Sequence, residues 1–137
     1  MRRSGFTLLE MMVVLFILTL VATVVAPKIL GRTDDARRTK AMADMKGIEQ
    51  ALNLYLMDNG AYPSTEQGLE ALVHKPDRPP VPRAWNASGY LQRMPSDPWG
   101  RPYVYIADGS RFALRSLGAD GVEGGEGKFG DLDSKDF

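Results

Sequence analysis

The stretch that decides the fold lies at the N-terminus, where residues 4–27 read SGFTLLEMMVVLFILTLVATVVAP. As a helix rising about 1.5 Å per residue, the apolar run Phe6–Ala26 would measure about 32 Å, close to the ~30 Å hydrocarbon core of a bilayer. Arg2 and Arg3 precede this run, so we expect the N-terminus to stay in the cytoplasm and the rest of the chain to lie across the membrane. One carboxylate, Glu10, lies inside the run. Because such a group costs about 2.5–3.5 kcal/mol at the membrane centre and less near its edge, Glu10 is a functional candidate.

Three interpretations of this segment compete. A secretory signal peptide would be cut after Ala26, but Pro27 would then follow the scissile bond directly and Glu10 would lie in the apolar region. A plain membrane anchor leaves Glu10 unexplained. A cut between Gly5 and Phe6 would create an amine on Phe6, one turn from Glu10 and at the positive end of the helix dipole. In a stack of staggered copies, Glu10 could instead pair with the Phe6 amine of the next copy. In this third interpretation, assembly neutralises the carboxylate and Glu10 sets the register.

Composition excludes several other classes. The 137 residues suffice for one domain beside the membrane segment, and 17 Lys+Arg against 17 Asp+Glu give no global reason to expect nucleic acid. The absence of cysteine excludes a disulfide framework and thiolate metal sites. There is one histidine, His74, and no phosphate-binding glycine loop, HExxH motif or nucleophile elbow. We therefore expect no enzyme.

Beyond the membrane segment, Pro27 and Gly31 are expected to interrupt or kink the helix. Residues 33–59 then predict an amphipathic helix that Asn59 and Gly60 end. Its apolar stripe, which we expect to cover the core of a small domain, consists of Met42, Met45, Ile48, Leu52, Tyr55 and Leu56.

The remaining chain predicts a short helix and two strands. A capping box from Ser64 to Gln67 starts the helix. The proline-rich residues 75–102 argue against regular structure, whereas YVYIA (103–107) and RFALRSL (111–117) predict strands joined by a turn at 108–110.

The C-terminal residues 118–137, GADGVEGGEGKFGDLDSKDF, are rich in glycine and acid. Carboxylates at irregular spacing, with glycines that free backbone carbonyls, suit calcium, but no EF-hand pattern is present. From composition alone a flexible, solvated tail is the default interpretation, and a calcium site is the alternative. The carboxylates are Asp120, Glu123, Glu126, Asp131, Asp133 and Asp136.

The N-terminal residues SGFTLLEMMVVLFIL (4–18) resemble the class III signal sequence of the type IV pilin superfamily. The resemblance implies that a prepilin peptidase cuts after Gly5 and N-methylates Phe6. It also implies that Glu10 is the residue on which assembly depends.

Three further segments resemble the major pseudopilins of type II secretion systems: MDNGAYPSTEQGLEAL (57–72), MPSDPWGRPYVY (94–105) and SLGADGVEGG (116–125). The resemblance implies an α+β, pilin-like fold. A long N-terminal helix, with a transmembrane half and an amphipathic half, packs on a small antiparallel sheet, and an acidic C-terminal loop follows. The implied domains are a leader at 1–5, a transmembrane helix at 6–26 and a periplasmic domain at 27–137.

The same resemblance implies a structural subunit, single-pass in the bacterial inner membrane, that forms a helical periplasmic filament of identical copies. Its expected partners are the prepilin peptidase, minor pseudopilins and an inner-membrane assembly platform, with no nucleic acid. The filament would help to export folded proteins through the outer membrane. The alternative is a type IV pilin, or a minor pseudopilin, of a surface fibre.

Major pseudopilins also resemble one another in a calcium-binding C-terminal loop. The implied ligands are carboxylates and backbone carbonyls at Leu117, Asp120, Val122 and Asp131. At the position of a further aspartate this chain has Phe129, whose ring cannot coordinate an ion. Three explanations stay open: Asp133 substitutes, affinity is weak, or the loop holds without metal.

Overall fold

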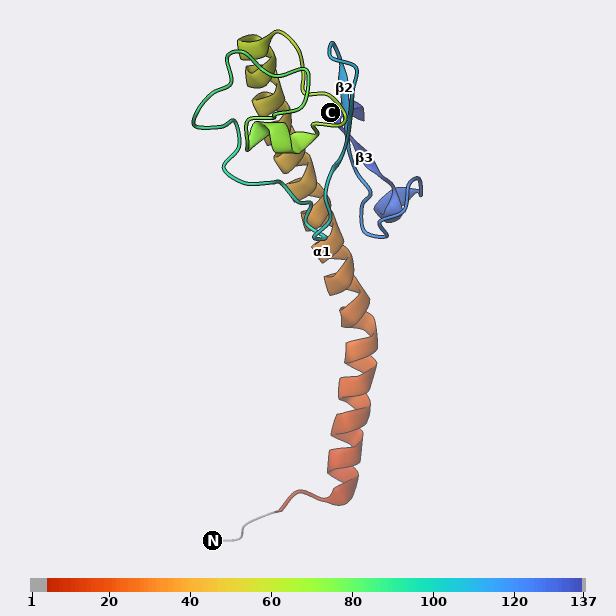
Figure 1. Cartoon of the computed structure of the whole chain (residues 1–137). Helices are drawn as coiled ribbons and strands as arrows, with labels where there is room; N and C mark the ends of the chain where they lie inside the picture. The colour runs from red at the N-terminus through yellow and green to blue at the C-terminus, as the bar shows by residue number, and fades with distance from the viewer. Residues whose placement is uncertain (1–4, 137) are drawn as a thin grey trace. The chain divides into compact units, whose positions relative to one another are not determined.

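The computed structural model describes residues 5–136, without the side chains of residues 26–32, 128 and 136. Helix α1 (Leu8–Asn59) comes first, followed by the 3-10 helix η1 (Leu69–Leu72) and strands β1 (Val104–Ala107) and β2 (Phe112–Ser116) (Figure 1). The 3-10 helix η2 (Gly127–Phe129), strand β3 (Leu132–Asp133) and the 3-10 helix η3 (Ser134–Asp136) complete the chain. Residues 1–4 of the expected leader lie outside the described residues. The chain divides into two compact units, residues 1–35 and 36–137, and each is considered by itself.

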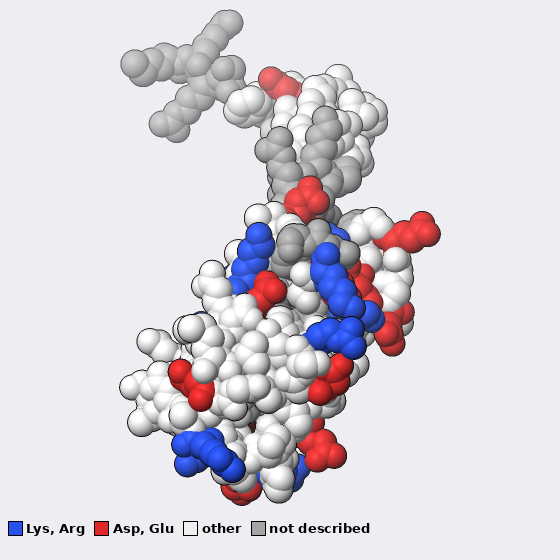
Figure 2. Space-filling model, turned by 90° about the horizontal axis from the view of Figure 1, so that it is seen from above, with Lys and Arg blue, Asp and Glu red and all other residues white. Residues whose placement is uncertain are grey.

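The first unit contains a long apolar stretch of α1. Residues Leu8–Val25 of α1 have a mean hydropathy of 2.7 and are long and apolar enough to cross a membrane. None of this window is buried inside the protein. The atoms drawn for this segment in Figure 2 are almost all white, with a red carboxylate near the end. Such a surface requires a bilayer or other apolar chains around it, because apolar area of this extent is unfavourable in water.

The predicted interruption of the helix at Pro27 is wrong, because α1 runs through residues 26–32, whereas the alternative of a kink stays a prediction. Proline lacks an N–H, so it removes the hydrogen bond to the carbonyl four residues earlier, at Thr23. The other backbone bonds of a long helix remain, and proline is more frequent in membrane helices than in soluble ones. The prediction gave too much weight to the helix-breaking tendency of Pro27 and too little to the length of the helical pattern around it.

In the second unit, most of the predicted apolar stripe of α1 is confirmed as core, but Leu56 is half-buried and lies outside the core cluster. Met45, Ile48, Leu52 and Tyr55 are buried, and Met42 packs against them from a half-buried position. The helix ends at the predicted place, where Gly60 takes a φ of +80° and donates its amide to the carbonyl of Leu56 at 2.7 Å. Core residues from elsewhere in this unit are Leu69, Ala71, Leu72, Tyr103, Tyr105, Leu114 and Leu132.

The sheet is antiparallel, in the order β1-β2-β3. Tyr105 pairs with Leu114 and both are buried, whereas Val104 and Ile106 on β1 face outward. The two predicted strands are confirmed within a residue of their ends. The short strand β3, which pairs Asp133 with Arg115 on β2, was not predicted.

The predicted capping box forms but does not start the helix, because η1 begins at Leu69 and its N-cap residue, Gly68, makes no side-chain cap hydrogen bond. In the capping box, the amide of Gln67 donates to Ser64 Oγ at 3.2 Å and the amide of Ser64 donates to Gln67 Oε1 at 3.0 Å. Within the described chain, residues 73–103 contain no helix or extended strand, and their isolated bridge joins Ser96 to Pro102. That bridge encloses the turn 97–101.

Candidate functional site

The first candidate site is the junction before α1. Gly5 and Phe6 precede the helix in a stretch without regular structure, and the Phe6 side chain is 79% exposed. A Cβ built on Gly5 would meet no atom within 4 Å. The Gly5–Phe6 bond therefore lies outside the regular helix of the described chain.

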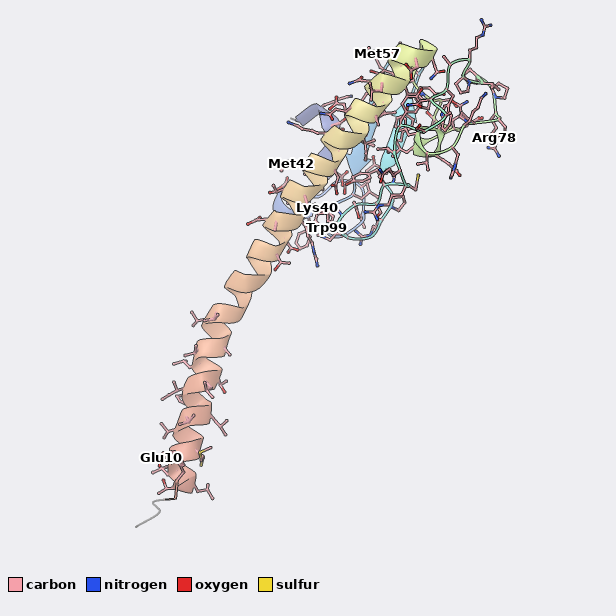
Figure 3. The ribbon with its side chains drawn as sticks, turned by 90° about the vertical axis from the view of Figure 1, so that its left-hand side faces the viewer. Glu10, Lys40, Met42, Met57, Arg78 and Trp99 are labelled. Atoms are coloured by element: carbon pink, nitrogen blue, oxygen red, sulfur yellow. The ribbon has the colours of Figure 1, made fainter. Side chains whose placement is uncertain are left out.

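Glu10 lies in the first turn of α1. Its amide donates to Thr7 Oγ1 at 3.2 Å, so Thr7 caps the helix N-terminus. Sequence reasoning missed this cap, although Thr-x-x-Glu has the same pattern that identified Ser64. The Glu10 side chain projects from the helix (Figure 3), and no described residue forms an ion pair with it. The carboxylate is thus available to a partner from outside this chain, or to an amine created at Phe6.

The second candidate site is the acidic loop after β2, residues 117–133. Asp97 binds the residue just before this loop. The Asp97 carboxylate is buried and accepts from the amides of Trp99 and Arg101 at 3.1 and 2.8 Å. It also accepts from the hydroxyl of Ser116, the last residue of β2, at 2.9 Å. The turn 97–101 is therefore fixed to the point where the loop begins.

From that turn, Arg101 reaches into the loop. Its Nη1 donates to the carbonyl of Gly118 at 2.8 Å, and its guanidinium approaches the carbonyl of Ala119 at 3.4 Å. Gly118 has a φ of +64°, and a Cβ there would lie 3.0 Å from the carbonyl oxygen of Gly130. The two ends of the loop are consequently packed backbone against backbone, which a side chain at residue 118 would prevent.

The predicted ligands at the start of the loop form two successive turns. The carbonyl of Leu117 accepts from the amide of Gly121 at 3.2 Å. Asp120 Oδ1 accepts from the amide of Val122 at 3.1 Å, and the Asp120 side chain is exposed. The arrangement leaves Asp120 Oδ2 without a hydrogen-bond donor among the described residues.

Asp131 lies at the opposite end of the loop. Its Oδ2 accepts from the amide of Gly124 at 3.0 Å, while its own amide donates to the Gly124 carbonyl at 3.3 Å. Its Oδ1 is buried and has no hydrogen-bond partner. A buried carboxylate oxygen without a donor is unfavourable, so this atom is suited to a cation.

Asp133 has other partners. Its Oδ2 accepts from Arg115 Nη2 at 3.3 Å and its Oδ1 accepts from the amide of Lys135 at 3.0 Å. Arg115 also lies 2.8 Å from Glu123 Oε1 and 3.9 Å from Asp131 Oδ2. The hydrogen bond to Asp133 is the main cause that raises the pKa of the Arg115 guanidinium above its ordinary value. Asp133 is thus already neutralised by a protein cation.

Two further observations bear on the metal prediction. Among the described residues, no group of three or more His, Cys, Asp or Glu side chains could hold a metal ion. An ion in this loop would therefore need backbone carbonyls beside Asp120 and Asp131. Phe129 is 46% exposed, so its ring does not stabilise the loop by deep burial.

Comparison with known proteins identifies the family. The family model described as "Type II secretion system (T2SS), protein G" matches residues 28–135, and the model "Prokaryotic N-terminal methylation motif" matches residues 1–26. The chain belongs to the type II secretion system protein G family. Core protein G of Pseudomonas aeruginosa is 52% identical over 98% of this chain and 96% of its own length. Core protein G of Vibrio cholerae is 47% identical over 96% of this chain and 90% of its own length.

A solved structure agrees with the protein G assignment. The crystal structure of the major pseudopilin from the type 2 secretion system of enterohaemorrhagic Escherichia coli matches with a TM-score of 0.70 and 41% identity. The match covers 81% of this chain and 96% of that one. The resemblance to major pseudopilins and the pilin-like α+β fold are thereby confirmed. Between the alternatives left open by the sequence, the protein G family favours a secretion subunit over a surface pilin.

Proposed function

We propose that this protein G chain is cut between Gly5 and Phe6, methylated on the Phe6 amine, and assembled into a helical filament of identical copies. The segment 6–26 anchors each subunit in the bacterial inner membrane, and the domain lies in the periplasm. The filament grows from an inner-membrane platform with minor pseudopilins and helps to export folded proteins through the outer membrane. The proposed role is structural rather than catalytic.

The observation that carries this proposal is the exposed Glu10 carboxylate in the first turn of an apolar helix. In a bilayer such a group is unfavourable unless it is paired, and the only partner that processing supplies is the new amine at Phe6. Within one subunit the pair would lie one turn apart. Between staggered subunits the same pair would fix the register of neighbouring helices, which explains why the carboxylate is present.

Mass spectrometry of the protein extracted from membranes tests the processing step. The expected mature chain begins at Phe6 and carries one methyl group. The leader takes Arg2 and Arg3 with it, so the mature side chains carry a net charge of −2. A mature N-terminus at Pro27 would instead support the secretory signal peptide and overturn the proposal.

Substitution of Glu10 tests the assembly step. Glu10→Val removes a costly group from the apolar segment, so membrane insertion is expected to persist or improve. Filaments and secretion are expected to be lost, because the Phe6 amine has no counter-charge. Thr7→Val is the matched control, since it removes a helix cap beside the same junction without removing the charge. Normal filaments from Glu10→Val would contradict the register argument.

The acidic loop is proposed to bind calcium through Asp120, Asp131 and the carbonyls of Leu117 and Val122. The unpartnered, buried Oδ1 of Asp131 supports this set. Asp133 is left out, because Arg115 and the amide of Lys135 occupy its oxygens. The ion would supply positive charge among carboxylates and hold the two ends of the loop together.

Melting of the full-length protein in detergent tests the calcium proposal. Fluorescence of Trp85 and Trp99 reports only on the second unit, because the chain has no other tryptophan. Millimolar calcium is expected to raise the melting temperature relative to chelator, by mass action on the folded state. Asp120→Ala is expected to abolish the gain, whereas Asp77→Ala, an exposed aspartate outside the loop, is expected to keep it. Identical curves with calcium and chelator would refute calcium binding.

A further inference from the structure

The acidic loop contains its own cation. Arg115 is the next-to-last residue of β2, and its guanidinium lies 2.8 Å from Glu123, 3.3 Å from Asp133 and 3.9 Å from Asp131. These carboxylates come from the first half of the loop, from its end and from β3. One side chain thus connects three acids that are separated along the chain.

The neighbourhood of Arg115 is partly shielded from solvent. The side chains of Arg115, Asp133 and Asp131 are 35%, 21% and 14% exposed, whereas Glu123 is 78% exposed. Without a cation, three carboxylates within reach of one guanidinium would repel one another in surroundings where water screens them incompletely. The loop also contains several glycines with positive φ, among them Gly124 and Gly125, so its ordered form has a high entropic cost. A cation that neutralises these carboxylates therefore stabilises the folded loop.

We infer that Arg115 is the resident counter-ion of the acidic loop: it holds residues 123–133 against β2 when no metal is bound and lowers the dependence of the loop on calcium. The second half of this statement rests on the calcium binding proposed above. It also accounts for Phe129, because a loop with an internal cation tolerates the loss of one ligand position.

Two other arginines support the arrangement without sharing its electrostatic role. Arg38, on α1, donates from Nη1 to the carbonyl of Gly130 at 2.8 Å, next to Asp131. Arg101 donates to the carbonyl of Gly118, next to Leu117. Both bonds end on backbone oxygens, whereas Arg115 lies among carboxylates. We therefore expect the loss of stability on removing the Arg115 charge to depend on whether calcium is bound.

The test compares Arg115→Met with Arg111→Met in the full-length protein, by tryptophan fluorescence melting in chelator and in millimolar calcium. Both substitutions remove one guanidinium and keep an unbranched stem. Arg111 precedes β2, is 86% exposed at its side chain and pairs only with Asp108 of its own turn at 3.6 Å. In chelator, Arg115→Met is expected to lower the melting temperature by about 4–8 °C, as for loss of a partly shielded ion-pair network in a domain of this size. Arg111→Met is expected to change it by less than about 2 °C.

Calcium distinguishes a counter-ion from a side chain that merely packs. Calcium is expected to restore at least half of the melting temperature that Arg115→Met loses. The rise in melting temperature on adding calcium is then larger in Arg115→Met than in the unsubstituted protein. A merely structural arginine would give the same loss in both conditions. If the unsubstituted protein gains stability with calcium and the loss in Arg115→Met is equal with and without it, the inference is overturned.

A second substitution keeps the test sharp if calcium has no effect on any variant. Asp133→Asn keeps the hydrogen bond from Lys135 and removes the charge. In the unsubstituted background it is expected to lower the melting temperature, because Arg115 loses a partner. In the Arg115→Met background, Asp133→Asn is expected to raise the melting temperature, because one of the repelling carboxylates is gone. With no calcium response, this reversal of sign would sustain the inference while the calcium proposal fails, and two shifts of the same sign would overturn the inference.

Discussion

Asp97→Ala is expected to destabilise the second unit more than any other loss of one carboxylate. The carboxylate is 3% exposed and accepts three hydrogen bonds, from the amides of Trp99 and Arg101 and from the hydroxyl of Ser116. Ser116 is fully buried, so its hydroxyl would lose a charged acceptor that water cannot replace. That loss costs about 1.5–3 kcal/mol, and the two amides, which lie nearer to solvent, add about 1 kcal/mol together. The total is about 2.5–4 kcal/mol.

Melting and urea denaturation of the full-length protein in detergent, followed by tryptophan fluorescence, measure this loss. For a domain of about 100 residues, 1 kcal/mol corresponds to about 4–8 °C, so the melting temperature is expected to fall by at least about 10 °C. Asp97→Asn is expected to lose only about 1–2 kcal/mol, because its oxygen still accepts from both amides and its NH₂ group can donate to Ser116 Oγ. The exposed Asp77→Ala serves as control and is expected to stay within about 0.5 kcal/mol.

A loss below about 1 kcal/mol in Asp97→Ala would refute this reasoning. It would mean that the turn 97–101 and the end of β2 are held by the hydrophobic core alone. Asp97→Asn and Asp97→Ala with equal losses would also contradict it, because equal effects would assign the contribution to the negative charge rather than to the geometry of the acceptors.

Three further predictions follow from single positions. Leu52→Ala, at a fully buried site on α1, is expected to cost about 2–5 kcal/mol in urea denaturation through the cavity that it leaves. Gly118→Ala is expected to cost more than Gly100→Ala when both are melted, since both have positive φ but a Cβ meets a carbonyl oxygen only at residue 118. The amide of Arg111 and other donors in the turn lower the pKa of Asp108, so its contribution to stability is present above the unfolded pKa and is lost as pH falls through the folded value. Asp108→Asn is expected to remove this part of the stability difference between about pH 6 and pH 3, measured as urea midpoints.

The sequence predicted those parts of the fold in which one periodic pattern dominates. Met45, Ile48 and Leu52 recur at helical spacing, and the structure buries all three. The helix-end signal at Gly60 was equally reliable, whereas the capping box at Ser64 forms its hydrogen bonds without starting a helix at that position. Local chemistry of this kind needs no knowledge of the rest of the chain.

What could not be predicted depends on contacts between distant residues. Strand β3 contains only Leu132 and Asp133, too few residues for an alternating pattern, and it exists because it pairs with β2. The role of Asp97 requires a buried hydroxyl 19 residues away at Ser116. Arg115 likewise contacts carboxylates that lie 8 to 18 residues away in the sequence, so composition shows them only as a surplus of negative charge. In the N-terminal segment the error was different, since the helix-breaking tendency of Pro27 was given more weight than the long apolar helix around it.

The loop after β2 shows how a chain without cysteine can fix an acidic, glycine-rich segment. A disulfide would restrict the unfolded chain, whereas the arginines act on the folded state alone. Arg38 and Arg101 hold the backbone at the two ends of the loop by donating to the carbonyls of Gly130 and Gly118. Arg115 compensates the charge in between, which backbone hydrogen bonds cannot do. The buried Oδ1 of Asp131 is the one carboxylate oxygen in the described loop that this arrangement buries without a partner. A cation at that oxygen would therefore partly compensate for the loss of Arg115, so calcium and Arg115 should each have the larger effect on stability when the other is absent.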